Sequence, residues 1–386
     1  RSSAASDVYK RQAFFHTWRT AQPRAIRKYI QAVRKEQEQY RSVYTLLSAI
    51  PDVYKTSFVS ASDPQNSQAA DILQLIDQRT HRLILGLPGA GKTTVLRVYQ
   101  HQALERQREL VRGTEKIPIF IPMKDYNLFL RDHQQASPDA QAEADQTIMM
   151  RNYLLHESEL LGIHHLRPYL AKLIEQGHIM FLCDGLNEVD SNHLETLCAE
   201  LCQLMRIPGN LVIMTCRELD YHQHQRVFGK LIADEYAAEV LITPLRDEQI
   251  AGFIKKYVDE QREKWRYAPE EIFDYIKKTR LRYECNNPLM LFTLMQTING
   301  IQDRNRMNID TRGKLLREFV SQLIGRELEK PKWKKVTFAS EDVRSFLSQV
   351  ACTARRAKCR NGILLGGAHG GNARRNRSNR EYASYL

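Results

Sequence analysis

The chain has 386 residues, of which 42% are apolar and 26% charged, so it is long enough for two or three domains with their own cores. This composition excludes a mainly disordered chain, and no run approaches the roughly 18 to 20 apolar residues that a membrane-spanning helix needs. The N-terminus lacks the apolar stretch of a signal peptide, and the seven scattered cysteines contain no C-x-x-C pair that would favour zinc or redox chemistry. We therefore expect a cytoplasmic protein with no membrane partner.

The net charge of +12 is concentrated at the two ends of the chain. Residues 1–41 hold ten Lys or Arg against three acids and residues 353–386 hold eight against one, so each end contributes +7 and the middle sums to −2. Basic segments can bind phosphate backbones or anionic lipids, but solvated or poorly ordered termini are the commoner explanation. With a near-neutral middle, the sequence does not favour a nucleic-acid partner.

Both ends also differ from the rest of the chain in composition. Residues 1–12 begin without methionine and resemble translated adapter sequence in assembled metagenomic data, whereas residues 361–386 are rich in Gly, Asn and Arg without periodicity. We expect the first segment to be an assembly artefact, the tail to be disordered or artefactual, and the chain to be a prokaryotic fragment.

The interior begins with helical spacing of apolar residues over 14–49, a polar linker at 60–68 and a helix at 69–78. Short apolar runs then alternate with helical patterns, which predicts a parallel sheet between helices, with ligands at the carboxyl ends of the strands. The predicted strands are 83–85, 117–121, 178–183, 210–215 and 238–242; the predicted helices are 94–111, 148–161 and 166–175, and 132–145 is predicted to be a loop.

Beyond Pro244 the pattern contains helices only, which indicates a separate helical region. The predicted helices are 247–258, 269–279, 288–297, 312–327 and 340–352.

The most informative segment is GLPGAGKT at residues 86–93, which fits G-x-x-x-x-G-K-[ST] between a predicted strand and helix. Its glycines let backbone N–H groups surround a polyphosphate, the lysine reaches the β and γ oxygens, and the hydroxyl binds magnesium. A glycine-rich turn that only caps a helix is the structural alternative. The motif predicts a phosphate-binding loop formed by Gly86, Leu87, Pro88, Gly89, Ala90, Gly91, Lys92, Thr93 and Thr94.

Two acids follow the apolar run 179–183. Asp184 lies where a buried strand would deliver a carboxylate beside the phosphate loop, and it could complete a magnesium shell with Thr93. Glu188 lies four residues further on, close enough to polarise an attacking water. A helix cap is the alternative role for an isolated acid after a strand.

Four segments in one order resemble NACHT domains. They are the phosphate loop LILGLPGAGKTT, the segment FLCDGLNE with Asp184, the strand VIMTCR ending at Arg217, and NPLML at 287–291. The resemblance covers about residues 70–330. The resemblance implies a signal-transduction ATPase of the STAND group of AAA-like P-loop proteins, with an NTPase core, a helical lid and a winged helix. It implies binding of ATP, in preference to GTP, together with Mg²⁺.

The resemblance also implies roles for single residues. Lys92 would hold the β and γ phosphates, Thr93 and Asp184 the magnesium, Arg217 the γ-phosphate, and Pro288 the base. A guanidinium at a strand end can neutralise charge on a transferred phosphoryl group, although a surface ion pair is the alternative for Arg217. With Glu188 as the base, the predicted catalytic residues are Glu188 and Arg217.

The chain departs from the family at Asn187, where the family has an acid. An amide cannot accept a proton, so Glu188 is the only nearby general base and we expect slow hydrolysis. The winged-helix histidine that senses the β-phosphate in the family cannot be assigned either, because His369 in the glycine-rich tail is the only histidine after His224.

We expect a nucleotide-dependent switch that self-associates as a homo-oligomer and whose fused sensor and effector domains are missing from this chain. A nucleic-acid-acting AAA-type ATPase is the alternative that draws on the basic ends, and a P-loop kinase is a third. The expected domains are 1–12 artefact, 13–78 helical segment and linker, 79–245 NTPase core, 246–302 helical lid, 303–360 start of the winged-helix region, and 361–386 tail.

Overall fold

The computed structural model describes residues 22–35, 58–60, 80–136, 148–232, 237–260, 262–301, 309–328, 345, 347–349 and 352. The chain divides into two compact units, residues 1–315 and 316–386, and all of the features below up to residue 315 belong to the first. The predicted helix 69–78, both terminal segments and most of the expected winged-helix region fall outside the described residues.

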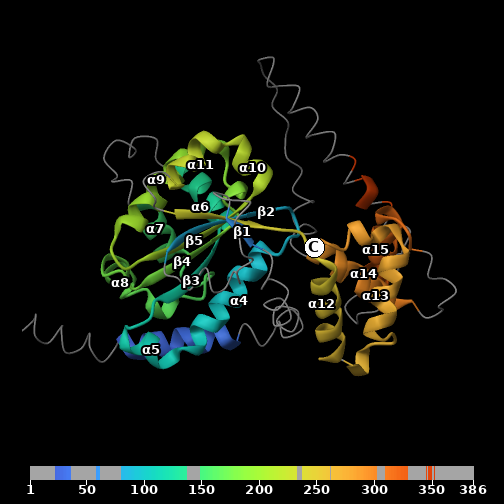
Figure 1. Cartoon of the computed structure of the whole chain (residues 1–386). Helices are drawn as coiled ribbons and strands as arrows, with labels where there is room; N and C mark the ends of the chain where they lie inside the picture. The colour runs from blue at the N-terminus through green and yellow to red at the C-terminus, as the bar shows by residue number, and fades with distance from the viewer. Residues whose placement is uncertain are drawn as a thin grey trace, which may run out of the picture. The chain divides into compact units, whose positions relative to one another are not determined.

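A six-stranded sheet in the order β1-β6-β2-β5-β4-β3 forms the centre of the first unit (Figure 1). Five strands are parallel, and the three-residue β1 pairs antiparallel with β6 at one edge. Every parallel strand was predicted, whereas β1 was not. The strands are β1 (Phe58–Ser60), β2 (His81–Gly86), β3 (Ile117–Pro122), β4 (Ile179–Asp184), β5 (Leu211–Arg217) and β6 (Ala237–Ile242).

Helices cover both faces of the sheet, with α9, α10 and α11 on one side and α4 on the other (Figure 1). The inner strands bury both of their faces, as the continuous apolar runs predict, and Phe181 and Leu182 are each 0% exposed although they point to opposite sides. The helices of this core are α4 (Lys92–Glu105), α5 (Gln107–Arg112), α6 (Met123–Ala136), α7 (Ile148–His156), α8 (Leu170–Glu175), α9 (Ser191–Arg206), α10 (Glu218–Gln223) and α11 (Gln225–Ile232).

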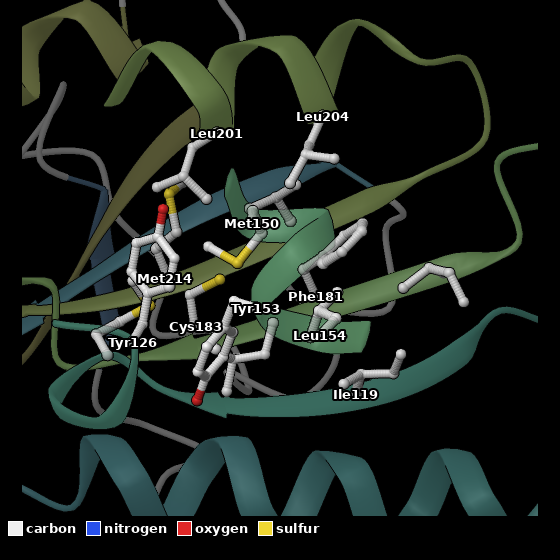
Figure 2. Close-up of a cluster of buried hydrophobic side chains, with 14 of the residues drawn as sticks. Ile119, Tyr126, Met150, Tyr153, Leu154, Phe181, Cys183, Leu201, Leu204 and Met214 are labelled. Atoms are coloured by element: carbon white, nitrogen blue, oxygen red, sulfur yellow. The ribbon is translucent and has the colours of Figure 1, made fainter. Parts of the chain in front are cut away.

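One face of the sheet carries the larger apolar cluster, which joins β3, β4 and β5 to α6, α7 and α9. Figure 2 shows side chains of these helices, among them Tyr126, Tyr153 and Leu201, on the face of β4 that carries Phe181 and Cys183. The Tyr126 and Tyr153 rings meet edge to face with centroids 5.2 Å apart, a favourable aromatic geometry. We call this packing, formed by the residues drawn in Figure 2, the closed-face cluster.

The prediction of a loop at 132–145 was partly wrong, because α6 extends from Met123 to Ala136. Met123, Tyr126 and Leu130 are buried at helical spacing, so the burial of this apolar face outweighs the polar and Ala-rich composition that follows it. The helix predicted over 94–111 is interrupted at Arg106, where α4 gives way to α5. The helix predicted over 148–161 ends earlier, at His156.

The helical region after β6 contains α12 (Asp247–Asp259), α13 (Pro269–Lys278), α14 (Pro288–Gly300) and α15 (Arg312–Leu328), close to the predicted bounds. Pro269 and Pro288 each occupy the first helical turn, where the missing N–H is not needed. The predicted helix 340–352 lies mostly outside the described residues. Within the part of the chain that the structure covers, no helix has the length and apolarity to span a bilayer.

A helix over residues 22–35 packs beside the edge strand β3. The Tyr29 hydroxyl donates to the Pro118 carbonyl, and Arg34 donates to the Leu104 carbonyl at the end of α4, 3.1 Å away. Pro118 lies within β3, which an edge strand tolerates because its outer side has no ladder hydrogen bonds to lose. Part of the helical segment predicted over 14–49 is therefore docked on the core.

Candidate nucleotide-binding site

The predicted phosphate loop connects β2 to α4 and contains two glycines in the left-handed region, Gly89 (φ 78°) and Gly91 (φ 89°). Such angles strain any residue with a side chain, and they let consecutive backbone N–H groups turn towards the inside of a loop. Helix α4 begins at Lys92, so the positive end of its dipole lies at the loop. This backbone has the form that a polyphosphate requires.

The Lys92 amine is held by the loop itself. Its Nζ donates to the carbonyls of Gly86 (2.9 Å) and Leu87 (3.0 Å). Burial lowers the pKa of Lys92, and the neighbouring guanidinium of Arg217 lowers it further, while the Asp184 carboxylate opposes the shift. Among the described residues, the hydrogen bonds of this ammonium group go to neutral carbonyls, so its charge is available to bind an anion.

Asp184 at the end of β4 joins three elements through its carboxylate. Its Oδ2 accepts from the Thr93 hydroxyl of α4 at 2.7 Å, and its Oδ1 accepts from the Thr215 hydroxyl of β5, also at 2.7 Å. Thr215 is 0% exposed and its oxygen in turn accepts from the Gly185 backbone N–H at 2.8 Å. The carboxylate is thereby fixed in place at the carboxyl edge of the sheet.

The residues present fit a magnesium nucleotide. A threonine hydroxyl and a carboxylate are hard oxygen donors of the kind that Mg²⁺ binds through one or two protein contacts, the phosphates and waters supplying the rest. Thr93 and Asp184 already lie in contact, next to the loop and the Lys92 amine.

Asn187 has a structural role that its position in the sequence did not reveal. Its carboxamide oxygen accepts from the backbone N–H of Arg217 at 3.0 Å, which ties the turn after β4 to the end of β5. This bond needs only an acceptor oxygen, so an amide can make it although an amide cannot act as a general base. Arg217 itself is exposed at the strand end.

Glu188 lies on the short 3₁₀ helix Leu186–Glu188, folded back over Gly185. Gly185 has φ 79°, and a side chain there would place its Cβ 3.2 Å from the Glu188 Cδ. The next turn is held by Asp190, whose carboxylate receives two bonds from Arg131 of α6, at 2.7 and 2.9 Å, while its backbone N–H donates to Asn127 at 3.1 Å. The hydrogen bonds from Arg131 are the main reason that the pKa of Asp190 is lowered.

The helical region contacts the phosphate loop directly. Asn287 caps α14 by accepting from the backbone N–H groups of Leu289 and Met290, and its Nδ2 donates to the Pro88 carbonyl of the loop at 2.9 Å. The Leu289 N–H also donates to the Gly89 carbonyl at 3.3 Å. A Cβ at Gly89 would lie 2.8 Å from the Asn287 Oδ1, so only glycine permits this approach. We call the hydrogen bonds from Asn287 to Pro88 and from Leu289 to Gly89 the lid contact.

The structure brings the predicted site residues to one edge of the sheet. Lys92 lies near Asp184 and Arg217, Thr93 bonds to Asp184, and Pro288 lies between the two residues of the lid contact. Sequence analysis missed Thr215 and Asn287. A polar residue near the end of an apolar strand was the signal for Thr215, and an Asn before Pro at a helix start was the signal for Asn287.

Other reactive side chains do not add to this site. Among the described residues, no three His, Cys, Asp or Glu side chains are grouped so as to hold a metal ion. Burial raises the pKa of the Cys183 thiol to about 12, so it acts as a small apolar side chain.

No family model and no curated protein matches the chain. Solved structures that it resembles include the Aeropyrum pernix Orc1 protein in complex with DNA (12% identity, TM-score 0.37, 66% of this chain and 65% of that one). Others are domain III of the Thermotoga maritima replication initiation protein DnaA (14%, 0.36, 64% and 88%) and C. elegans PCH-2 (13%, 0.36, 76% and 69%). The chain spans just under two thirds of the Orc1 protein, and likenesses this distant carry no argument about function.

The chain's own geometry defines its class. A parallel sheet between helices, the loop between β2 and α4, and an aspartate at the end of the strand two places away constitute an α/β P-loop NTPase fold.

Proposed function

We propose that this protein is a NACHT-type signal-transduction switch that binds ATP with Mg²⁺, hydrolyses it slowly, and changes conformation and self-association with the nucleotide state. Lys92 would hold the β and γ phosphates, Thr93 and Asp184 the metal, and Arg217 the γ-phosphate. Bound Mg²⁺ would neutralise charge on the phosphates. Pro288 would pack on the base. In the family that the chain resembles, this proline packs on adenine, so we expect ATP rather than GTP.

The observation that carries the proposal is the lid contact. Pro88 and Gly89 give their carbonyls to Asn287 and Leu289, so a phosphate-induced movement of the loop alters the bonds that hold the first turn of α14. A loop that served catalysis alone would not need this contact. Differential binding between two states is the only route by which a ligand shifts a conformational equilibrium.

Slow hydrolysis follows from the turn after β4. Asn187 is occupied with the Arg217 backbone and offers no proton acceptor, which leaves the Glu188 carboxylate as the base. We expect Glu188→Gln to slow hydrolysis at least tenfold and to leave ATP affinity unchanged, since one general base contributes about 10²- to 10⁴-fold. Many turnovers per second in the wild type, or an equally fast variant, would contradict the switch.

Calorimetry with ATP and Mg²⁺ tests the binding site. Lys92→Ala should weaken binding at least about 100-fold, because it removes a charge-assisted contact to the phosphates. The matched control is Lys124→Ala, a change of the same charge at an exposed position of α6, which should bind like the wild type. Heat that does not depend on magnesium, or equal binding by both variants, would refute the site.

Light scattering with ATP, ADP and no nucleotide tests the switch separately from the site. We expect the molar mass of the protein particle in solution to differ between the ATP and ADP states. The alternative, a nucleic-acid-acting AAA-type ATPase, predicts instead that DNA stimulates hydrolysis with a steep salt dependence. An ATP-binding protein that stays monomeric in every state would retain the site and reject the switch.

A further inference from the structure

The helix over residues 22–35 has two unlike faces. Its inner face places Ile26, Tyr29, Ile30 and Val33 in the core, where they are 0 to 4% exposed. The bonds from Tyr29 to Pro118 and from Arg34 to Leu104 fix its position against β3 and α4. The outer face is therefore presented in a defined orientation.

The outer face is basic. Arg24, Arg27, Lys28 and Lys35 are exposed and recur at helical spacing, and residues 22–35 contain no acid. Among the residues that the structure describes, none of these four cations forms an ion pair. We call these four side chains the basic stripe.

The stripe continues onto the neighbouring turn. Partial burial and the positive charges of His164 and Lys28 lower the pKa of His165, which places Lys28 close to the 3₁₀ helix His164–Leu166. His164 and Arg167 on this turn are also exposed. Arg167 thus adds a positive charge from an element far from the stripe in the sequence.

A stripe of one sign is more than solubility requires. Surface helices elsewhere in the chain mix their charges: α12 and α13 each carry three acids and two lysines. Unpaired like charges on one helix repel each other, so an arrangement without acids is costly unless an anion compensates it.

We propose that the basic stripe binds the phosphate backbone of double-stranded nucleic acid without sequence preference. From Arg24 to Lys35 the helix rises roughly 16 Å, which matches about five successive phosphates of one strand at 3.4 Å of axis each. Arg and Lys contacts to phosphates position a protein on a duplex and do not read its sequence.

A membrane surface fits this helix less well. A helix that lies in a bilayer interface inserts its apolar face into the lipid. Here Ile26, Tyr29 and Ile30 are already buried in the core, so only charge would remain for a membrane.

Fluorescence anisotropy with a labelled duplex of about 30 base pairs tests the proposal across a salt series. In the wild type, log K should fall with log salt. Substituting Arg24, Arg27, Lys28 and Lys35 by Gln should reduce this slope by about 3.6 and weaken binding at least tenfold near 100 mM salt. Each single substitution should reduce the slope by about 0.9, which tests the proposal even where the fourfold variant folds poorly.

The matched control replaces Lys255, Lys264, Lys277 and Lys278 by Gln, the same change of charge on exposed side chains of the helical region. It should bind within about twofold of the wild type. Equal losses of duplex affinity in both fourfold variants would show that the effect depends on net charge and not on the basic stripe. If neither variant lost affinity, any binding by the wild type would be assigned to the termini. No binding by the wild type, or binding only to vesicles containing phosphatidylserine, would overturn the proposal. Because ATP affinity is measured separately, these outcomes leave the proposed switch untouched.

Discussion

The two faces of the sheet differ in what their apolar clusters reach. On one face, the cluster around the closed-face packing joins the strands to the core helices and contains no buried residue of α12, α13 or α14. On the other face, Ile84, Leu182 and Ile213 belong to a cluster that continues through α4 into α12, α13 and α14. Because side chains alternate along a strand, neighbouring residues of one strand serve the two clusters.

This difference suggests a division between stability and response. The cluster on the closed face contains no buried residue of the helical region that makes the lid contact, so we expect it to contribute mainly to the unfolding free energy. The second cluster connects the loop-bearing helix α4 to α14, so its packing should also affect nucleotide binding. The following changes test this division, in order of decreasing effect.

The largest contrast should come from two leucines that are both 0% exposed, Leu201 of α9 and Leu291 of α14. Replacing either by Ala should cost about 2 to 5 kcal/mol of unfolding free energy, since each leaves a cavity. Leu201→Ala should leave the ATP affinity of the folded protein unchanged, whereas Leu291→Ala should alter it. Denaturant titration and calorimetry measure the two effects, and equal affinities in both variants would erase the distinction between the faces.

Glu200 gives the closed face a pH dependence. Its Oε2 accepts from the Tyr126 hydroxyl at 2.6 Å. Burial raises the pKa of Glu200 from 4.5 to about 7, against the opposing effects of the Tyr126 hydroxyl and the Met150 backbone. The protonated acid is the form that the fold stabilises. The contribution of protonated Glu200 to the unfolding free energy is therefore complete below pH 4.5 and is lost as the pH rises through about 7.

Glu200→Gln should remove this loss, which amounts to at most about 3 kcal/mol between acidic and alkaline pH. Unfolding titrations at several pH values should show that the unfolding free energy of the variant increases relative to that of the wild type as the pH rises. Nucleotide affinity should be unaffected. Tyr126→Phe should raise the pKa of Glu200 further, because it removes a bond to the ionised form. A variant with the wild-type pH profile would show that Glu200 does not titrate in this range.

Thr215→Val tests the nucleotide edge with a smaller change. The variant keeps the shape of the side chain but removes the donor to Asp184 and the acceptor for Gly185, which should cost about 1 to 3 kcal/mol. Magnesium-dependent ATP binding should weaken about tenfold, because Asp184 is no longer fixed. Thr297→Val in α14, where the hydroxyl bonds within its own helix, is the control that should leave metal dependence intact.

Arg131→Gln should have the smallest effect. The two bonds to Asp190 hold the residue that follows the Glu188 turn, so their loss should slow single-turnover hydrolysis about two- to fivefold through misplacement of Glu188. ATP affinity should stay the same, and Arg131→Lys should restore the charge but not the paired geometry. A change in affinity instead of rate would show that the clamp supports the site as a whole.

Much of this architecture could be predicted from periodicity. The parallel strands are continuous apolar runs and the phosphate loop has a fixed spacing, so β2, β4 and β5 and the placement of Lys92 and Asp184 followed from the sequence. The strand β1 did not, because three residues pairing at a sheet edge give too little pattern. Helix α6 was missed because it begins directly after Pro122 and ends in a polar stretch.

The contacts that organise the site were less accessible. Whether Asn187 reaches the backbone of Arg217 depends on the path of a turn between two strands. Likewise, the bond from Asn287 to Pro88 joins residues 199 positions apart. Sequence spacing constrains neighbours along a helix or strand, and such long-range pairs follow only from the assembled fold.

Deuterium exchange at the Leu289 backbone amide tests the central claim most directly, because this N–H donates to the phosphate loop. We predict that its exchange rate differs at least about tenfold between the Mg²⁺–ATP and Mg²⁺–ADP states, that amides of α9 do not respond, and that Asn287→Ala abolishes the difference while ATP still binds. Identical exchange at Leu289 with ATP, with ADP and without nucleotide would contradict a switch that reads its nucleotide through α14.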